Sequence, residues 1–120
     1  MLPFITNIGI LIIAIMHLWF LVLEMFLWQK PLGLKVFGMD TVFASQTAAL
    51  AANQGLYNGF LCTGLIWSLL SANDVLTFQL KIFFLSCIIV AGIYGGLSVN
   101  RKIFFVQACP ALLVLALLFS

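Results

Sequence analysis

Charged side chains are scarce in this sequence. They make up 7% of its 120 residues, whereas hydrophobic residues make up 65%. A soluble domain of this length needs more polar surface, because roughly a quarter of the residues in typical globular domains are charged. A membrane is therefore the expected environment, with the lipid bilayer as the surrounding partner.

Basic residues are too few and too scattered for nucleic-acid binding. The formal net charge is only +2, and no stripe of Lys or Arg interleaved with aromatic residues is present. We expect no nucleic-acid partner.

Motifs for metal binding, cofactor binding and the common catalytic mechanisms are absent as well. The three cysteines, Cys62, Cys87 and Cys109, lie in apolar segments without CxxC or Cys/His spacing and are expected to be free thiols. There is no glycine-rich phosphate loop and no nucleophile elbow. The sequence therefore predicts no metal site and no cofactor, and it leaves open whether the protein is an enzyme.

Long apolar runs, by contrast, fill most of the chain. About 20 apolar residues suffice for a helix to cross the hydrocarbon core of a membrane, and short polar segments separate four runs of that length. We predict an all-α fold, an integral membrane four-helix bundle that forms a single transmembrane domain over residues 1–120. Its helices are expected at about 3–28, 41–71, 75–98 and 103–119.

The connections between these runs carry the local signals that end helices. The first, Gln29–Asp40, contains Pro31 and two glycines and is predicted to be a loop. The second is a short turn in which Asn73 or Asp74 is placed to cap the third helix. The second run exceeds the length of one crossing, so we expect its helix to be tilted or bent.

Basic residues set the expected orientation. Lys30 and Lys35 lie in the first loop, and Arg101 and Lys102 lie in the third. The positive-inside rule then puts both loops in the cytoplasm and both termini outside. No basic residue precedes the first apolar run, so we expect a retained helix there and no cleaved signal peptide. Lys81, inside the third run, is expected to extend its side chain back to the outer interface.

Pairs of glycines four residues apart mark where helices approach closely. Gly55 and Gly59 lie in the second run, and Gly92 and Gly96 lie in the third. This spacing lets two backbones meet without side chains between them. It serves packing within one chain or a homodimer interface, and the sequence leaves both open.

Polar side chains inside the apolar runs are costly in a membrane, so each needs a partner or a purpose. At a rise of about 1.5 Å per residue, they fall at one depth near the cytoplasmic side. Glu24 lies in the first run, and His17 lies two turns deeper on the same face, since residues seven apart differ by about 20°. The other members of this predicted polar layer are Asn53, Gln54, Tyr57 and Asn58 of the second run, Tyr94 of the third and Gln107 of the fourth.

Two interpretations of the polar layer compete. It is either a hydrogen-bonded network that fixes the register of the helices, with Glu24 neutral, or a site for ligand binding and proton exchange. The residue types favour a site, because Ser or Thr could hold helices together at lower cost than a carboxylate and an imidazole. Pro110 is expected to kink the fourth helix and to free a carbonyl group beside Gln107.

The chain resembles the bacterial membrane proteins grouped as domain of unknown function 1304. The resemblance rests on MHLWFLVLEMFLW (Met16–Trp28), KVFG (Lys35–Gly38), AANQGLYNGF (Ala51–Phe60) and VQACPALL (Val106–Leu113). It covers essentially the whole chain and implies four membrane helices, a bacterial inner membrane and no established activity. The motifs that define the family fall on His17, Glu24, Asn53, Gln54, Tyr57, Asn58 and Gln107, while Cys109 stands where a small residue is expected.

Three functions are compatible with these features. The favoured one is binding or transport of a small lipophilic or cationic molecule, with proton exchange at Glu24. The first alternative is a membrane-embedded enzyme, such as an isomerase in which Glu24 and His17 act as acid and base on a lipophilic substrate. The second is a structural or accessory membrane subunit whose polar layer holds a partner helix.

Overall fold

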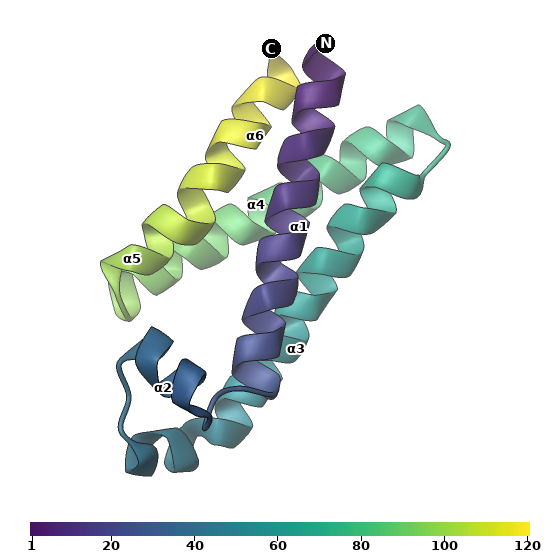
Figure 1. Cartoon of the computed structure of the whole chain (residues 1–120). Coiled ribbons are helices and arrows are strands. Elements are labelled where there is room, and N and C mark those ends of the chain that lie inside the picture. The colour runs from purple at the N-terminus through teal and green to yellow at the C-terminus, as the bar shows by residue number, and fades with distance from the viewer. The chain divides into compact units, whose positions relative to one another are not determined.

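The computed structural model describes all residues, Met1–Ser120, and the fold is all-α (Figure 1). No strand is present. The elements are α1 (Leu2–Met25), α2 (Pro31–Phe37), α3 (Thr41–Leu70), α4 (Asp74–Ser98), α5 (Arg101–Ile103), the π-helical turn η1 (Phe104–Ala108) and α6 (Cys109–Phe119). The last three form one continuous helix, Arg101–Phe119.

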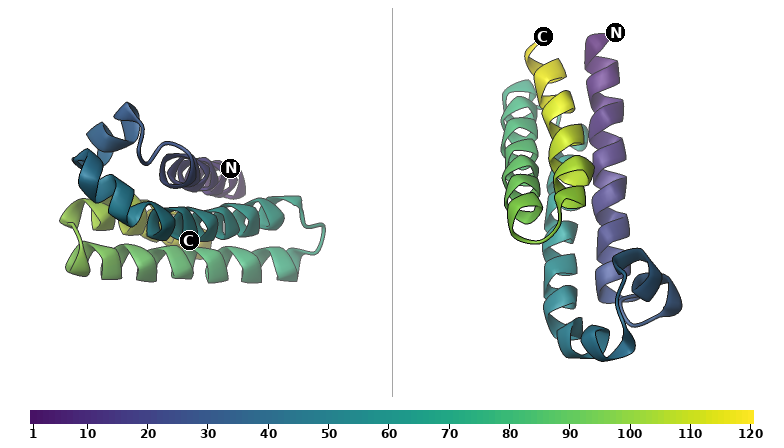
Figure 2. Two further views of the ribbon diagram at one scale, coloured as in Figure 1. Left: turned by 90° about the horizontal axis from the view of Figure 1, so that it is seen from below. Right: turned by 90° about the vertical axis from the view of Figure 1, so that its left-hand side faces the viewer.

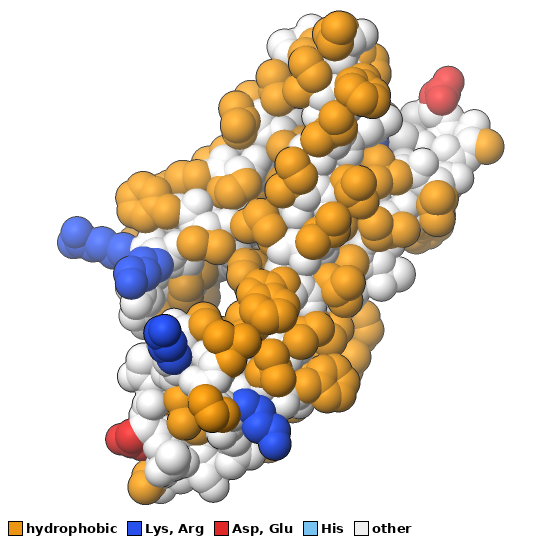
Figure 3. Space-filling view, in the orientation of Figure 1, with side chains coloured by type: hydrophobic (Ala, Val, Ile, Leu, Met, Phe, Trp, Pro, Cys, Tyr) orange, Lys and Arg blue, Asp and Glu red, His pale blue; other side chains and the backbone are white.

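Three helices are long and apolar enough to cross a membrane: α1, α4 and Arg101–Phe119. They correspond to the first, third and fourth predicted spans. The 30-residue α3 is not among them, because small and polar residues fill its first half up to Asn58. Hydrophobic side chains nevertheless cover most of the face shown in Figure 3, which is typical of a surface that meets lipid.

The predicted loop at Gln29–Asp40 is wrong in part, since it contains the short helix α2. Pro31 stands in the first turn of α2, where the missing N–H costs nothing and the fixed φ suits a helix. Gly38 ends the helix in the left-handed conformation, at φ 62°, and its N–H donates to Leu34 O and Lys35 O. Gly33 is buried, and a Cβ there would collide with the carbonyl oxygen of Leu27.

Side-chain caps begin two of the longer helices. Asp40 Oδ1 accepts from the N–H of Phe43 at 2.7 Å, at the start of α3. Asn73 Oδ1 accepts from the N–H of Leu76 at 2.9 Å, at the start of α4. The predicted Asn cap of the third long helix is confirmed.

The chain divides by its internal contacts into two compact units. Unit 1 comprises Met1–Ala14 and Thr63–Ser120, and unit 2 comprises Ile15–Cys62. The single transmembrane domain stays a prediction. In unit 1, α4 lies beside the helix made of α5, η1 and α6 in both views of Figure 2.

Glycines on α4 allow this close approach within unit 1. A Cβ on Gly92 would lie 2.5 Å from the backbone nitrogen of Ala108, and one on Gly96 would lie 2.7 Å from the Cβ of Phe104. No side chain fits between the two backbones at these points. The Gly92 and Gly96 pair therefore serves packing within one chain, which is one of the two roles that the sequence left open.

A π-helical turn stands where the kink at Pro110 was expected. The N–H of Cys109 donates to Phe104 O, five residues back, instead of four. This wider turn precedes the proline, which has no N–H to donate. Gln107 lies within the turn and is half-buried.

Lys81 is held by a hydrogen bond inside unit 1. Its side chain is only 8% exposed, and Nζ donates to Oδ1 of Asn7 at 2.6 Å. Both residues belong to unit 1. The amide oxygen on α1 gives the buried ammonium group an acceptor, and the extension of Lys81 to the outer interface stays a prediction.

Candidate functional site

A buried hydrogen bond between two helices of unit 2 forms the centre of the candidate site. Asn58 Nδ2 on α3 donates to Oε1 of Glu24 on α1 at 2.6 Å. Glu24 is 5% exposed and Asn58 is 6% exposed. Bonds between an amide donor and a carboxyl oxygen are among the strongest side-chain hydrogen bonds when water is excluded.

Glycines on α3 bring the two helices together at this point. A Cβ on Gly55 would lie 2.7 Å from Cγ of Met25 and 3.1 Å from Cβ of Glu24, and one on Gly59 would lie 2.7 Å from Leu21. The glycine spacing that was predicted to allow close approach thus acts within unit 2. It brings the α3 backbone close enough to the carboxyl group of Glu24 for the short Asn58 side chain to reach it.

The Gln54 side chain also hydrogen-bonds to the Glu24 carboxyl group. Gln54 stands one turn before Asn58 on α3, so two amides approach the same carboxyl from one helix. Within unit 2, the structure thus brings together Glu24, Gln54 and Asn58 of the predicted polar layer.

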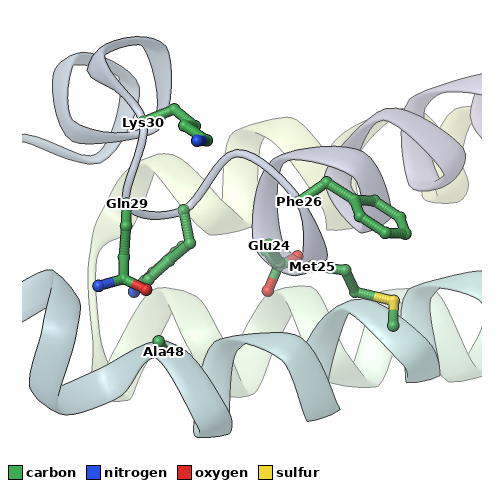
Figure 4. A pocket seen from close by; sticks show the side chains of 7 residues that line it. Glu24, Met25, Phe26, Gln29, Lys30 and Ala48 are labelled. Atoms are coloured by element: carbon green, nitrogen blue, oxygen red, sulfur yellow. The ribbon is translucent and has the colours of Figure 1, made fainter.

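The carboxyl group lies at the wall of a pocket of about 290 Å³ (Figure 4). Its lining combines apolar and polar side chains from α1, α3 and the segment between α1 and α2: Glu24, Met25, Phe26, Trp28, Gln29, Lys30 and Ala48. Figure 4 shows Glu24 at the end of α1, and Gln29 and Lys30 on the segment that follows it. Small-molecule sites combine apolar walls with a few polar groups, and this pocket exposes at least as much polar as apolar surface.

Trp28 fixes the segment that forms one side of the pocket. Its Nε1–H donates to Oγ1 of Thr47 on α3 at 3.0 Å. Its ring packs against Phe37 of α2, with centroids 4.7 Å apart. The indole therefore connects the end of α1 to both α2 and α3, a more specific role than the interface anchoring typical of tryptophan.

His17 is fully buried in α1 and packs edge-to-face against Phe20, with ring centroids 5.2 Å apart. No buried side-chain nitrogen or oxygen lacks a hydrogen-bond partner. His17 does not line the pocket. Seven residues along α1 separate it from Glu24, about 10 Å at the usual rise, so the two do not share a proton directly.

The remaining predicted site residues lie elsewhere. Asn53 and Tyr57 are exposed on α3, and the Tyr57 ring contacts Phe60. In unit 1, Tyr94 is 72% exposed on α4, and Gln107 is half-buried in η1. One continuous layer of eight side chains stays a prediction.

Sequence reasoning missed the pocket side chains that follow α1. Gln29 and Lys30 were assigned only to a loop, and Ala48 was not singled out. The available signal was their position: Gln29 and Lys30 come five and six residues after Glu24, just past the end of α1. A helix predicted between Pro31 and Gly38 would have implied that the chain turns back after α1, and so that Gln29 and Lys30 lie near the carboxyl group.

No group of three or more His, Cys, Asp and Glu side chains lies close enough together to hold a metal ion. Cys62, Cys87 and Cys109 are free thiols and half-buried. The chemistry of the site therefore comes from one carboxyl group and its amide partners.

Comparison with known proteins gives a family and one curated relative. The family described as Protein of unknown function (DUF1304) matches residues 11–119, as the sequence resemblance indicated. An uncharacterized protein, YpaA, from Lactococcus lactis subsp. lactis (strain IL1403), is 31% identical over 107 residues, which cover 88% of each chain. No solved structure matches the chain.

Proposed function

This chain belongs to the DUF1304 family of proteins of unknown function. From the residues of the candidate site, we propose that it binds or transports a small lipophilic or cationic molecule. The ligand occupies the pocket at Glu24, which exchanges a proton with it. The observation that carries the proposal is the buried Glu24 carboxyl group, held by Asn58 at the wall of a pocket.

The proposal includes a bundle of four membrane spans in a bacterial inner membrane, with both termini outside. Its fourth span is α3, whose 30 residues measure about 45 Å, more than the hydrocarbon core of about 30 Å. The excess length lets the polar first half of α3 extend into the interface. Lys30 and Lys35, together with Arg101 and Lys102, then mark the cytoplasmic side.

The pocket's size and lining support a small, partly apolar ligand. Its volume of about 290 Å³ lies just below the range for ligand pockets, about 300–1,000 Å³. Met25, Phe26 and Trp28 supply apolar walls, and Glu24 supplies one acidic group. This composition suits one apolar body with one polar or cationic end.

Lys30 limits the charge that the ligand can carry. Its side chain lines the same pocket as Glu24, so a second positive charge on the ligand would face a cation without a second carboxylate. A neutral molecule or a singly charged amine fits this charge pattern. Binding of a positively charged amine is coupled to loss of the Glu24 proton, because the carboxylate then pairs with the ammonium group of the ligand.

Burial of a single carboxyl group also motivates a homodimer in the proposal. One chain offers few polar groups to carry a ligand across a membrane, and two copies would offer two carboxyl groups. Asn53 and Tyr57 are exposed on α3, where they can hydrogen-bond to a second copy and avoid lipid.

The enzyme alternative has less support. It needs His17 and Glu24 to act on one substrate, yet only Glu24 lines the pocket. The His17 ring packs on Phe20 within α1, so the pocket does not present the pair of His17 and Glu24 that this alternative requires.

Uptake into vesicles tests the proposal. The purified protein is reconstituted into liposomes with an imposed pH gradient, and accumulation of tetraphenylphosphonium, a singly charged lipophilic cation, is followed. We expect uptake that depends on the gradient in the wild type and that loses this dependence in Glu24→Gln, which keeps the size of the side chain and removes the exchangeable proton.

The exposed Gln46 provides the matched control, since Gln46→Ala removes an amide on α3 outside the pocket lining and away from the proposed dimer contact. It is expected to keep the gradient dependence. Gradient-driven uptake that persists unchanged in Glu24→Gln rules the proposed proton exchange out.

A further inference from the structure

A second cleft lies in unit 1, between α4 and the helix that follows it. It has a volume of about 280 Å³ and is lined by Ile93, Gly96 and Leu97 of α4, Arg101 of α5, and Phe104 and Phe105 of η1. Arg101 is the only polar side chain among these residues. The cleft shares no residue with the pocket at Glu24.

Glycines on α4 shape this cleft. The turn after α4 closes so tightly that a Cβ on Gly95 would lie 2.8 Å from Cγ2 of Ile103. At Gly96, Phe104 occupies the space that a Cβ would need. Large apolar side chains remain on the outside, where Leu97 is 86% exposed and Phe105 is 64% exposed. Such side chains require an apolar neighbour.

The charge at the mouth of the cleft is positive and has no acidic partner. Arg101 and Lys102 are both exposed and adjacent in the chain. The only acidic residue of unit 1 is Asp74, at the opposite end of the 25-residue α4, which spans about 37 Å. Over that distance salt screens an exposed pair almost completely.

An apolar cleft lined by Arg101, with the exposed Lys102 next to it in the chain, has the chemistry of an anionic lipid site. We propose that unit 1 binds one anionic phospholipid, whose phosphate lies at Arg101 and Lys102 and whose acyl chain lies against Leu97, Phe104 and Phe105. Basic residues next to membrane helices attract anionic headgroups. The exposed aromatic and aliphatic side chains give the acyl chain of the lipid an apolar surface to pack against. This site is additional to the Glu24 pocket and does not depend on its function.

Lipid competition read by native mass spectrometry tests this site. The protein in mild detergent is mixed with equal amounts of a phosphatidylglycerol and a phosphatidylcholine of identical acyl chains, and the bound lipids are counted. Each basic residue near an anionic headgroup contributes about 1 kcal/mol, or about 5-fold. We expect a preference for phosphatidylglycerol of about 25-fold in the wild type and about 5-fold in Arg101→Gln.

Two further variants separate charge from the cleft. Lys35→Gln removes one exposed positive charge from α2 in unit 2 and is the matched control for Arg101→Gln, expected to keep the wild-type preference. Phe105→Ala opens a wall of the cleft with no change in charge, and is expected to lower retention of both lipids without changing their ratio.

Three results would overturn the proposal. The first is a wild-type preference retained by Arg101→Gln, and the second is an equal loss in Lys35→Gln. The third is displacement of the bound lipid by millimolar sn-glycerol 1-phosphate, since a headgroup without acyl chains would then suffice.

Discussion

Replacing Gly92 with leucine is expected to lower the free energy of unfolding by about 3 kcal/mol. Even a Cβ at this position would lie 2.5 Å from the backbone nitrogen and 2.8 Å from the Cβ of Ala108. The neighbour is backbone in a continuous helix, so it cannot rotate away as a flexible side chain could. The helix Arg101–Phe119 must move away from α4, with loss of the packing of α4 against η1 and α6.

The adjacent residue gives the control for this prediction. Ala91 is exposed on the same helix, so Ala91→Leu adds a larger apolar side chain without a collision and is expected to leave stability nearly unchanged. Thermal unfolding of both variants in the same detergent measures the difference. Equal midpoints for Gly92→Leu and the wild type would show that α4 and the last helix do not pack this closely.

Replacing Asn58 with leucine is expected to lower the free energy of unfolding by about 2–3 kcal/mol. The two side chains have the same number of heavy atoms and the same branching, so most of the loss comes from the hydrogen bond to Oε1 of Glu24 and from the buried carboxyl oxygen that then has one donor fewer. Gln54 alone is left to bond to the carboxyl group.

A double variant distinguishes the hydrogen bond from packing. Adding Glu24→Leu to Asn58→Leu removes both partners and is expected to recover most of the lost stability, since two apolar side chains replace a polar pair. Asn53→Leu, on the exposed side of α3, should cost little. If Asn53→Leu and Asn58→Leu are equally destabilising, the Glu24 bond contributes nothing specific to the fold.

The sequence predicted the long helices because each apolar run is about long enough for one crossing and is bounded by polar residues. The helix ends agree to within a few residues at α3, α4 and the last helix. The first helix ends at Met25, earlier than the predicted 28, because the chain turns there toward α2. That short helix was missed because Pro31 and the glycines were taken only as helix breakers, although proline in a first turn and glycine after a last turn also bound helices.

The candidate site was predictable in its centre and not at its edges. Glu24 and Asn58 were both singled out as polar residues in apolar helices, and the structure joins them. Asn53 and Tyr57 were assigned to the same layer from depth alone. Depth follows from the helical rise, but the rotation of α3 about its axis depends on the Gly55 and Gly59 contacts, which turn Asn53 and Tyr57 outward. The first part of α3 carries small and weakly polar residues without a distinct apolar stripe, so the hydrophobic pattern does not fix this rotation.

Native mass spectrometry of the wild type and Glu24→Gln, each released from mild detergent, tests the central proposal most directly. It reads the subunit count and any small molecule retained. We predict a defined non-lipid adduct on the wild type that is absent from the folded Glu24→Gln protein. Two equally folded proteins that are equally empty would contradict a ligand site at Glu24, and would leave the Glu24–Asn58 bond with the role of fixing helix register.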